Sequence, residues 1–110
     1  MRVVLVRGGK EWTPGLQQWI DVLRNILRGT TEVSTKSGRQ VAIGLPSDTG
    51  AVVFVTRGML DIAHNVKRQY PDLKVIVLTA CRRDDNNGII FIDKDRFDAE
   101  VFLNILRLST

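Results

Sequence analysis

Two kinds of segment alternate along the chain. The first is a short, continuous run of apolar, mostly β-branched residues, which is typical of a strand buried on both faces of a sheet. The second repeats apolar residues at intervals of three and four, which predicts a helix with one buried face. Strand-like and helix-like segments follow one another five times. This order predicts one α/β domain, a parallel sheet with helices on both faces.

Five segments have strand patterns, and the second of them alternates only weakly, so we expect it at an edge of the sheet. The predicted strands are Arg2–Val6, Glu32–Lys36, Ala51–Thr56, Val75–Leu78 and Ile89–Ile92. Capping signals place the helices between them. Thr13 followed by Pro14 begins the first helix and Ser37 begins a short one, while Asp95 or Asp98 caps the last. The apolar face predicted for the last helix consists of Phe97, Val101, Phe102, Ile105 and Leu108.

Composition narrows the class of protein. The 110 residues are 44% hydrophobic and 25% charged, which fits a single domain spanning residues 1–110. A single cysteine excludes a disulfide framework and a multi-cysteine metal site, so we expect a reducing, cytoplasmic location. No apolar run approaches the roughly 20 residues of a membrane span. The net charge of +4 is compatible with an acidic partner.

Three motifs resemble those of response-regulator receiver domains. Tyr70–Ala80 is similar to the family's fourth strand, in which a proline at a helix end leads into a strand that finishes in Thr-Ala. Ser37–Ala42 is similar to its second strand-to-helix turn, and Lys94–Glu100 to the start of its last helix, without the family's proline. The resemblance implies a flavodoxin-like, three-layer sandwich with a five-stranded parallel sheet in the order 2-1-3-4-5.

The chain departs from that family at the positions that carry its chemistry. Receivers have two acidic residues after the first strand, where this chain has Arg7 and Gly8. They have a phosphate-accepting aspartate at the end of the third strand, where this chain has Val55–Arg57. Only Thr79 and Lys94 match functional residues of the family. Because Mg²⁺ needs clustered oxygen ligands, we expect a degenerate pseudo-receiver with no metal, no cofactor and no aspartyl phosphorylation.

The connection before the last predicted strand is short. Ala80–Gly88 supplies nine residues, whereas a parallel crossover with its helix usually needs about 10–12. We therefore expect the fourth helix of the receiver fold to be short or missing. The alternative is an antiparallel hairpin, because Asn87-Gly88 is a strong turn signal.

Basic residues follow four of the five predicted strands. In an open parallel sheet, ligands bind beyond the carboxyl ends of the strands. These residues therefore form a candidate site for phosphate, a nucleotide or a nucleic-acid backbone: Arg7, Lys10, Arg57, Arg82, Arg83 and Lys94. The alternative is solvated loop charge, neutralised by the acidic residues Asp84, Asp85, Asp93 and Asp95.

Ile89–Ile92 places large apolar side chains on both faces of the last strand. With the fourth helix missing, one face is expected to be exposed, and exposed apolar patches mark interaction surfaces. A homodimer or another protein partner would then bind through Ile90, Ile92 and Phe102. The alternative is that the helix carrying Met59 moves over to cover the gap.

No residue pattern indicates an enzyme. His64 is the only histidine and has no nucleophile near it in the sequence, and Cys81 beside Arg82 and Arg83 is a small apolar filler or a reactive thiol. Trp12 could stack on a base or form a hydrophobic lid, while Trp19 belongs to a core stripe. We therefore predict a phosphorylation-independent regulatory module that binds protein and self-associates, with anion binding as the alternative.

Overall fold

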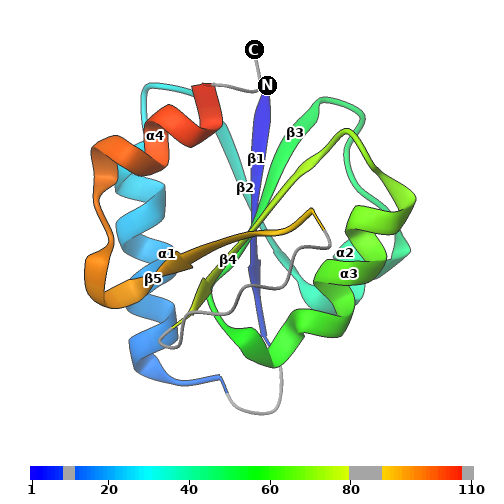
Figure 1. The fold of residues 1–110 in the computed structure, drawn as a ribbon, viewed down its shortest axis with the longest axis horizontal. Coiled ribbons are helices and arrows are strands. Elements are labelled where there is room, and N and C mark those ends of the chain that lie inside the picture. The colour runs from blue at the N-terminus through cyan, green and yellow to red at the C-terminus, as the bar shows by residue number, and fades with distance from the viewer. Residues whose placement is uncertain (9–11, 80–87, 108–110) are drawn as a thin grey trace.

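Five strands form one parallel sheet in the order β2-β1-β3-β4-β5 in the computed structural model, which describes residues 1–8, 12–79 and 88–107. α1 and α4 cover one face of the sheet, and α2 and α3 the other (Figure 1). The strands are β1 (Arg2–Arg7), β2 (Glu32–Ser37), β3 (Thr49–Phe54), β4 (Lys74–Thr79) and β5 (Ile90–Asp93). The helices are α1 (Pro14–Leu27), α2 (Gly38–Ile43), α3 (Leu60–Gln69) and α4 (Ala99–Arg107). The predicted flavodoxin-like sandwich is confirmed.

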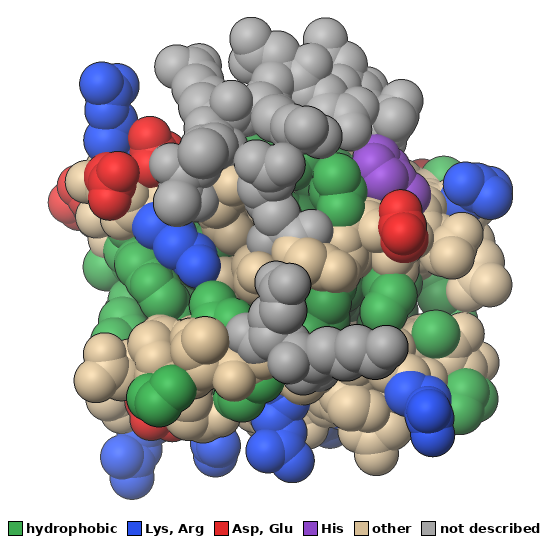
Figure 2. Space-filling model, turned by 90° about the horizontal axis from the view of Figure 1, so that it is seen from below, with side chains coloured by type: hydrophobic (Ala, Val, Ile, Leu, Met, Phe, Trp, Pro, Cys, Tyr) green, Lys and Arg blue, Asp and Glu red, His purple; other side chains and the backbone are tan. Residues whose placement is uncertain are grey.

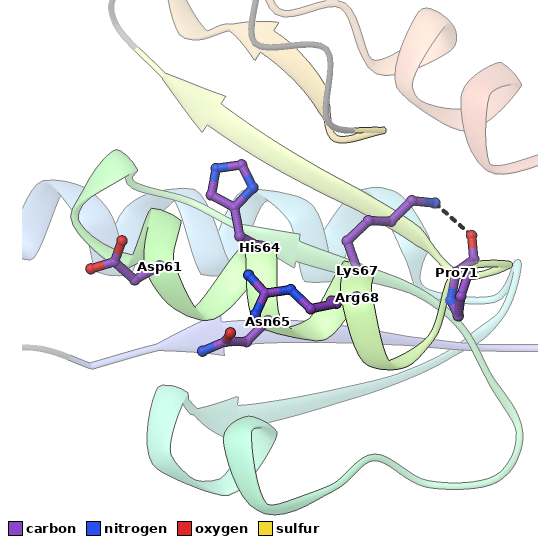
Figure 3. Close-up of a pocket in the computed structure, with 6 residues that line it drawn as sticks. All are labelled: Asp61, His64, Asn65, Lys67, Arg68 and Pro71. Carbon is purple, nitrogen blue, oxygen red and sulfur yellow. Dashed lines mark hydrogen bonds between the residues drawn. The ribbon is translucent and has the colours of Figure 1, made fainter.

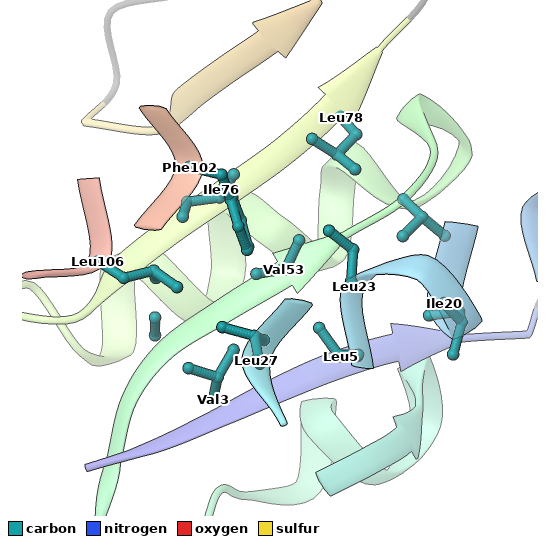
Figure 4. Packing of buried hydrophobic residues seen from close by; sticks show 12 residues of the cluster. Val3, Leu5, Ile20, Leu23, Leu27, Val53, Ile76, Leu78, Phe102 and Leu106 are labelled. Atoms are coloured by element: carbon teal, nitrogen blue, oxygen red, sulfur yellow. The ribbon is translucent and has the colours of Figure 1, made fainter. Parts of the chain in front are cut away.

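The sheet is held between two separate hydrophobic cores. Val3–Val6 of β1 are completely buried, because alternate side chains point into opposite helical layers. Leu5 packs with Leu23 of α1 and Phe102 of α4 (Figure 4). Val4 packs on the other face with Ala63 of α3. The continuous apolar run of β1 therefore corresponds to a strand that is covered on both faces.

The direction of β5 decides between the two predictions made for it. β5 runs parallel to β4, with Ile76 opposite Ile90 and Thr79 opposite Asp93. The alternative antiparallel hairpin is therefore wrong. No helix lies between β4 and β5 in the described ranges. Residues 80–87 of that connection lie outside those ranges, so the expected short or missing fourth helix stays a prediction.

Side-chain caps place the first turns of the helices as predicted. Thr13 Oγ1 accepts from the N–H of Leu16 at 3.2 Å, and Pro14 is the first helical residue. Ser37 and Gln40 form a reciprocal capping box, with bonds of 2.9 and 3.2 Å, at the start of α2. Asp98, rather than Asp95, caps α4 and accepts from the N–H of Glu100 at 2.8 Å.

The buried face of α4 differs from the predicted one. Phe102 and Leu106, four residues apart, are buried against the sheet, whereas Val101 is 53% exposed. Val101 fits the three-and-four spacing with Ile105, so periodicity alone does not tell which of the two adjacent stripes faces the sheet. The packing of Phe102 in the core beside α1 decides it.

Candidate functional site

The carboxyl ends of the strands lie along one edge of the molecule. Because all pairings are parallel, the ends of β1 at Arg7, β2 at Ser37 and β4 at Thr79 share that edge. Each of α1, α2 and α3 begins a short distance after a strand ends there. Figure 2 views this edge and shows charged side chains around its border with hydrophobic ones between them. The edge therefore combines helix N-termini with Arg7 and Lys94, two of the predicted basic residues.

Arg7 is exposed at the end of β1. Its register partner in β2 is Ser37, and Arg7 makes no ion pair or side-chain hydrogen bond with any residue that the structure describes. Gly8 follows with φ of 102°, a conformation that side-chain-bearing residues rarely adopt. The chain thus turns sharply after β1 and leaves the guanidinium of Arg7 in solvent.

The chain after β3 offers a hydroxyl in place of a carboxylate. Val55 is completely buried. Thr56 Oγ1 accepts from the N–H of Gly58 at 3.2 Å and so supports the turn into the 3-10 helix Arg57–Met59. The side chain of Thr56 therefore has a local structural task in the turn that follows β3.

The two family-matched residues lie at the ends of β4 and β5. Thr79 is 1% exposed and lies opposite Asp93. Asp93 accepts from the N–H of Asp95 at 2.9 Å and caps the 3-10 helix Lys94–Arg96. The ammonium of Lys94 lies 5.9 Å from the centroid of the Trp19 ring, which is a cation–π arrangement, and partial burial lowers the pKa of Lys94. Lys94 is therefore engaged with α1.

The predicted anion site is covered only in part by the described residues. Arg7 and Lys94 lie at the carboxyl edge as predicted, whereas Lys10, Arg82 and Arg83 lie outside the described residues, as does the side chain of Arg57. Cys81, Asp84 and Asp85 also lie outside them. Whether these cations form one site therefore stays a prediction. Across residues 1–8, 12–79 and 88–107, no three His, Cys, Asp or Glu side chains are grouped to hold a metal ion.

The predicted interface residues differ in accessibility. Ile90 and Ile92 are half-buried and pack against the core beneath α1 and α4. Phe102 is completely buried, so its side chain is removed from the proposed interface. On the opposite face of the sheet, Ile89 is 7% exposed and belongs to the core beneath α2 and α3. That side of the strand is therefore covered by the core beneath α2 and α3, whereas the sulfur of Met59 lies beside Gly38 of α2, so coverage of the strand by Met59 itself stays a prediction.

The aromatic side chains near α1 belong to the core. Trp12 is half-buried and packs against the hydrophobic cluster, as the lid interpretation expects. Trp19 meets Phe97 edge to face, with ring centroids 5.2 Å apart, and Phe97 in turn lies 5.6 Å from Phe102. This aromatic row fastens the chain before α4 onto α1.

His64 borders a wide hollow on the outer side of α3. The hollow has a volume of about 890 Å³ and is lined by Asp61, His64, Asn65, Lys67, Arg68 and Pro71. In Figure 3, His64 and Lys67 point to one side of α3, whereas Asn65 and Arg68 point away from it. Lys67 donates to the carbonyl groups of Pro71 at 2.8 Å and Leu73 at 2.9 Å. Because the polar groups diverge and Lys67 closes a turn, the hollow has no convergent catalytic set.

A second hollow, which no sequence motif predicts, lies between the last turns of α1 and the edge strand β2. Its volume is about 620 Å³, and Arg24, Arg28 and Val33 are among the residues that line it. The only signal in the sequence is the spacing of the two arginines, which places them on one side of α1.

Within the described ranges, no helix is long and apolar enough to cross a membrane.

Comparisons with solved structures identify the fold. The response regulator TrrA of Thermotoga maritima, solved with Mg²⁺ and BeF, is 19% identical, with a TM-score of 0.72 over 99% of this chain and 98% of that one. The receiver domain of an HD-domain protein from Pseudomonas fluorescens is 17% identical, with a TM-score of 0.71 over 98% and 92%. TrrA in complex with the histidine kinase ThkA gives 16% identity and a TM-score of 0.67 over 99% and 98%.

These likenesses establish that the chain has the receiver fold. No protein-family model matches the sequence, and no curated protein matches it. Because every identity quoted is below 20%, the fold is shown and the chemistry has to be argued from the residues of this chain.

Proposed function

We propose that the chain is a receiver-like regulatory module that acts through protein contacts and without aspartyl phosphorylation. The observation that carries the proposal is the carboxyl end of β1, where an exposed arginine, Arg7, stands at the place of the receiver's acidic pair. A guanidinium there repels Mg²⁺, which needs clustered oxygen ligands. The chain after β3 supports the same conclusion, because Thr56 supplies a hydroxyl that is already used in a turn.

Phosphorylation independence is tested by incubating the protein with Mg²⁺ and either acetyl phosphate or beryllofluoride. We expect no mass increase with acetyl phosphate and no Mg²⁺-dependent change in the amide spectrum with beryllofluoride. TrrA, which was solved with Mg²⁺ and BeF, serves as the positive control under the same conditions. A Mg²⁺-dependent phosphoryl adduct on this chain would overturn the proposal.

Self-association through β5 and α4 is the finer part of the proposal. Ile90 and Ile92 are half-buried, and α4 adds the exposed Val101. Apolar side chains on the outer side of a helix are candidates for contact with a second copy. Light scattering at high micromolar concentration is expected to give a dimer, and Val101→Asp is expected to give a monomer.

The matched control for that variant is Val22→Asp, because Val22 is 45% exposed on α1, outside the proposed interface. This variant is expected to remain dimeric. A wild-type protein that is monomeric at high micromolar concentration would contradict self-association. The proposal would then be limited to contact with a different protein.

Anion binding at the carboxyl edge is the second candidate function. It is favoured by Arg7, whose exposed guanidinium has no ion-pair partner in the described ranges, and by α1 and α2, which have no acidic residue in their first turns. Titration with inorganic phosphate or ATP at low salt is expected to shift the amides of residues 7, 8 and 94. Arg7→Ala should weaken that binding several-fold, and unchanged spectra would exclude this function.

A further inference from the structure

The outer edge of β2 is open for an added strand. β2 is one of the two edge strands and pairs only with β1 among the described residues. It has six residues and no proline, whereas β5 at the other edge has four. The unpaired N–H and C=O groups of such an edge are a template for another extended chain. The question is which chain the surroundings of β2 favour.

α1 borders this edge with a row of polar and charged side chains. Gln17, Asp21, Arg24 and Arg28 follow one another at intervals of four, three and four, so they share one side of the helix. The hollow of about 620 Å³ lies at the end of this row and is lined by Asp21, Arg24, Asn25, Arg28, Gly29, Thr31 and Val33. Because Val33 belongs to β2, the hollow reaches from the helix to the strand edge.

The charges around this edge are unbalanced in favour of cations. Arg24 and Arg28 are exposed and make no ion pair within the described ranges. Lys36 of β2 and Arg39 of α2 add two more cations at the carboxyl end of the strand. Figure 2 shows basic side chains gathered along its lower border, which corresponds to the β2 side of Figure 1.

The acidic groups at the same edge are already occupied. Asp21 accepts from the side-chain amide of Gln17 at 3.3 Å. The carboxylate of Glu32 lies 2.9 Å from the guanidinium of Arg2. Asp21 also lines the hollow, but neither Arg24 nor Arg28 forms an ion pair in the part that the structure describes, so carboxylates of a ligand can pair with them.

We propose that the outer edge of β2 binds an acidic, extended segment of another protein by strand addition. The backbone of the segment pairs with β2, and the carboxylate side chains on its α1 face meet Arg24 and Arg28 at the hollow beside Val33. A second copy of this chain fits less well, because β2 has a single acidic residue, Glu32, which is already paired with Arg2. A nucleic acid would use the charges but leave the strand edge unpaired.

The experiment is an amide NMR titration with a synthetic probe, a capped heptapeptide of alternating valine and glutamate. Its control is the same peptide with alternate backbone amides N-methylated, which keeps every side chain and charge but removes the donors on one edge. We expect shifts confined to β2 and the last two turns of α1, slower hydrogen exchange in β2, and at least about tenfold weaker binding of the methylated peptide.

Two charge-reversal variants separate this edge from general attraction to a basic protein. Arg24→Glu combined with Arg28→Glu should weaken binding about tenfold, because two exposed attractions become repulsions. Arg68→Glu combined with Arg96→Glu, two exposed sites away from β2 on α3 and on the 3-10 helix before α4, makes the same change in net charge and should bind like the wild type.

Three results would overturn the proposal. One is the absence of binding at millimolar peptide in low salt. Another is equal binding of the methylated peptide, which would show charge attraction without strand addition. The third is tighter binding of oligo(dT) than of the peptide at Arg24 and Arg28, which would assign the edge to nucleic acid. The methylated peptide tests wild-type protein, so the proposal stays testable if a variant does not fold, and none of these results depends on self-association or phosphorylation.

Discussion

The two arginines at the ends of β1 have the same side chain but different surroundings. Arg2, at the amino end, donates from Nε to the carboxylate of Asp48 at 3.0 Å and from Nη2 to Glu32 at 2.9 Å. Arg7, at the carboxyl end, is exposed and has no ion-pair partner among the residues described. The residues between them, Val3–Val6, are completely buried.

The difference shows how the two edges of the sheet are divided between stability and binding. Arg2 connects the edge strand β2, through Glu32, to the turn before β3, through Asp48. It therefore fastens three segments of the chain at the amino edge. At the carboxyl edge the parallel register brings Ser37, which is uncharged, opposite Arg7. The side chain of Arg7 has no such structural task and is available to a ligand.

A change in the buried strand between the two arginines should have the largest effect on stability. Leu5 is completely buried in the middle of β1, and Leu5→Ala removes a packed side chain and leaves a cavity. We expect the free energy of unfolding to fall by about 2–5 kcal/mol in denaturant titrations. A loss below about 1 kcal/mol would contradict the close packing of the core around β1.

Gly8 tests the turn that follows Arg7 at the carboxyl end of β1. Its φ of 102° is unfavourable for a residue with a Cβ atom, so Gly8→Ala should cost about 1–2 kcal/mol of unfolding free energy. Gly44→Ala is the matched control, because Gly44 has extended backbone and no atom within 4 Å of an added Cβ. Equal stability of the two variants would contradict the assigned turn after Arg7.

The arginines themselves give the direct test. Arg2→Ala should lower the Tm, because Asp48 and Glu32 lose their partner, whereas Arg7→Ala should leave the Tm unchanged. Differential scanning calorimetry at low salt measures both, and the Arg2 effect should shrink in high salt because the groups are exposed. A larger loss for Arg7→Ala would reverse the comparison.

The smallest effect is a pH dependence at the amino edge. The hydrogen bond from Arg2 is the main cause that lowers the pKa of Asp48. A carboxyl whose pKa is lower in the folded chain stabilises the fold above its unfolded pKa, and this stabilisation is lost as pH falls through the folded value. The Tm difference between wild type and Arg2→Ala should therefore narrow below about pH 4. A difference that stays constant on acidification would contradict the assignment.

Much of the fold could be predicted from local patterns. Continuous apolar runs identified four strands and a weak alternation identified β2. Thr13 and Ser37 marked the first turns of α1 and α2, because caps depend only on residues a few positions apart. The direction of β5 could not be decided in this way. A parallel crossover and a hairpin both fit the short connection, and only pairing with β4 distinguishes them.

The candidate site was less predictable, because contacts between distant segments form it. Phe102 was assigned to a surface that it does not reach, since the three-and-four spacing fits either stripe of α4. Lys94 was placed correctly after β5, but its contact with Trp19 depends on how α1 packs. The hollow between Arg24, Arg28 and Val33 combines a helix with the following strand and had no motif to indicate it.

The amino-acid sequence by itself determined the strands, the helix caps and the presence of Arg7 and Gly8, with no carboxylate, at the end of the first strand. These features follow from local periodicity and residue type, which do not depend on the rest of the chain. Only the tertiary structure decided which cations are neutralised. Arg2 meets Asp48, a residue 46 positions away, while Arg7 meets no described acid, because partners across a sheet are chosen by strand order and register.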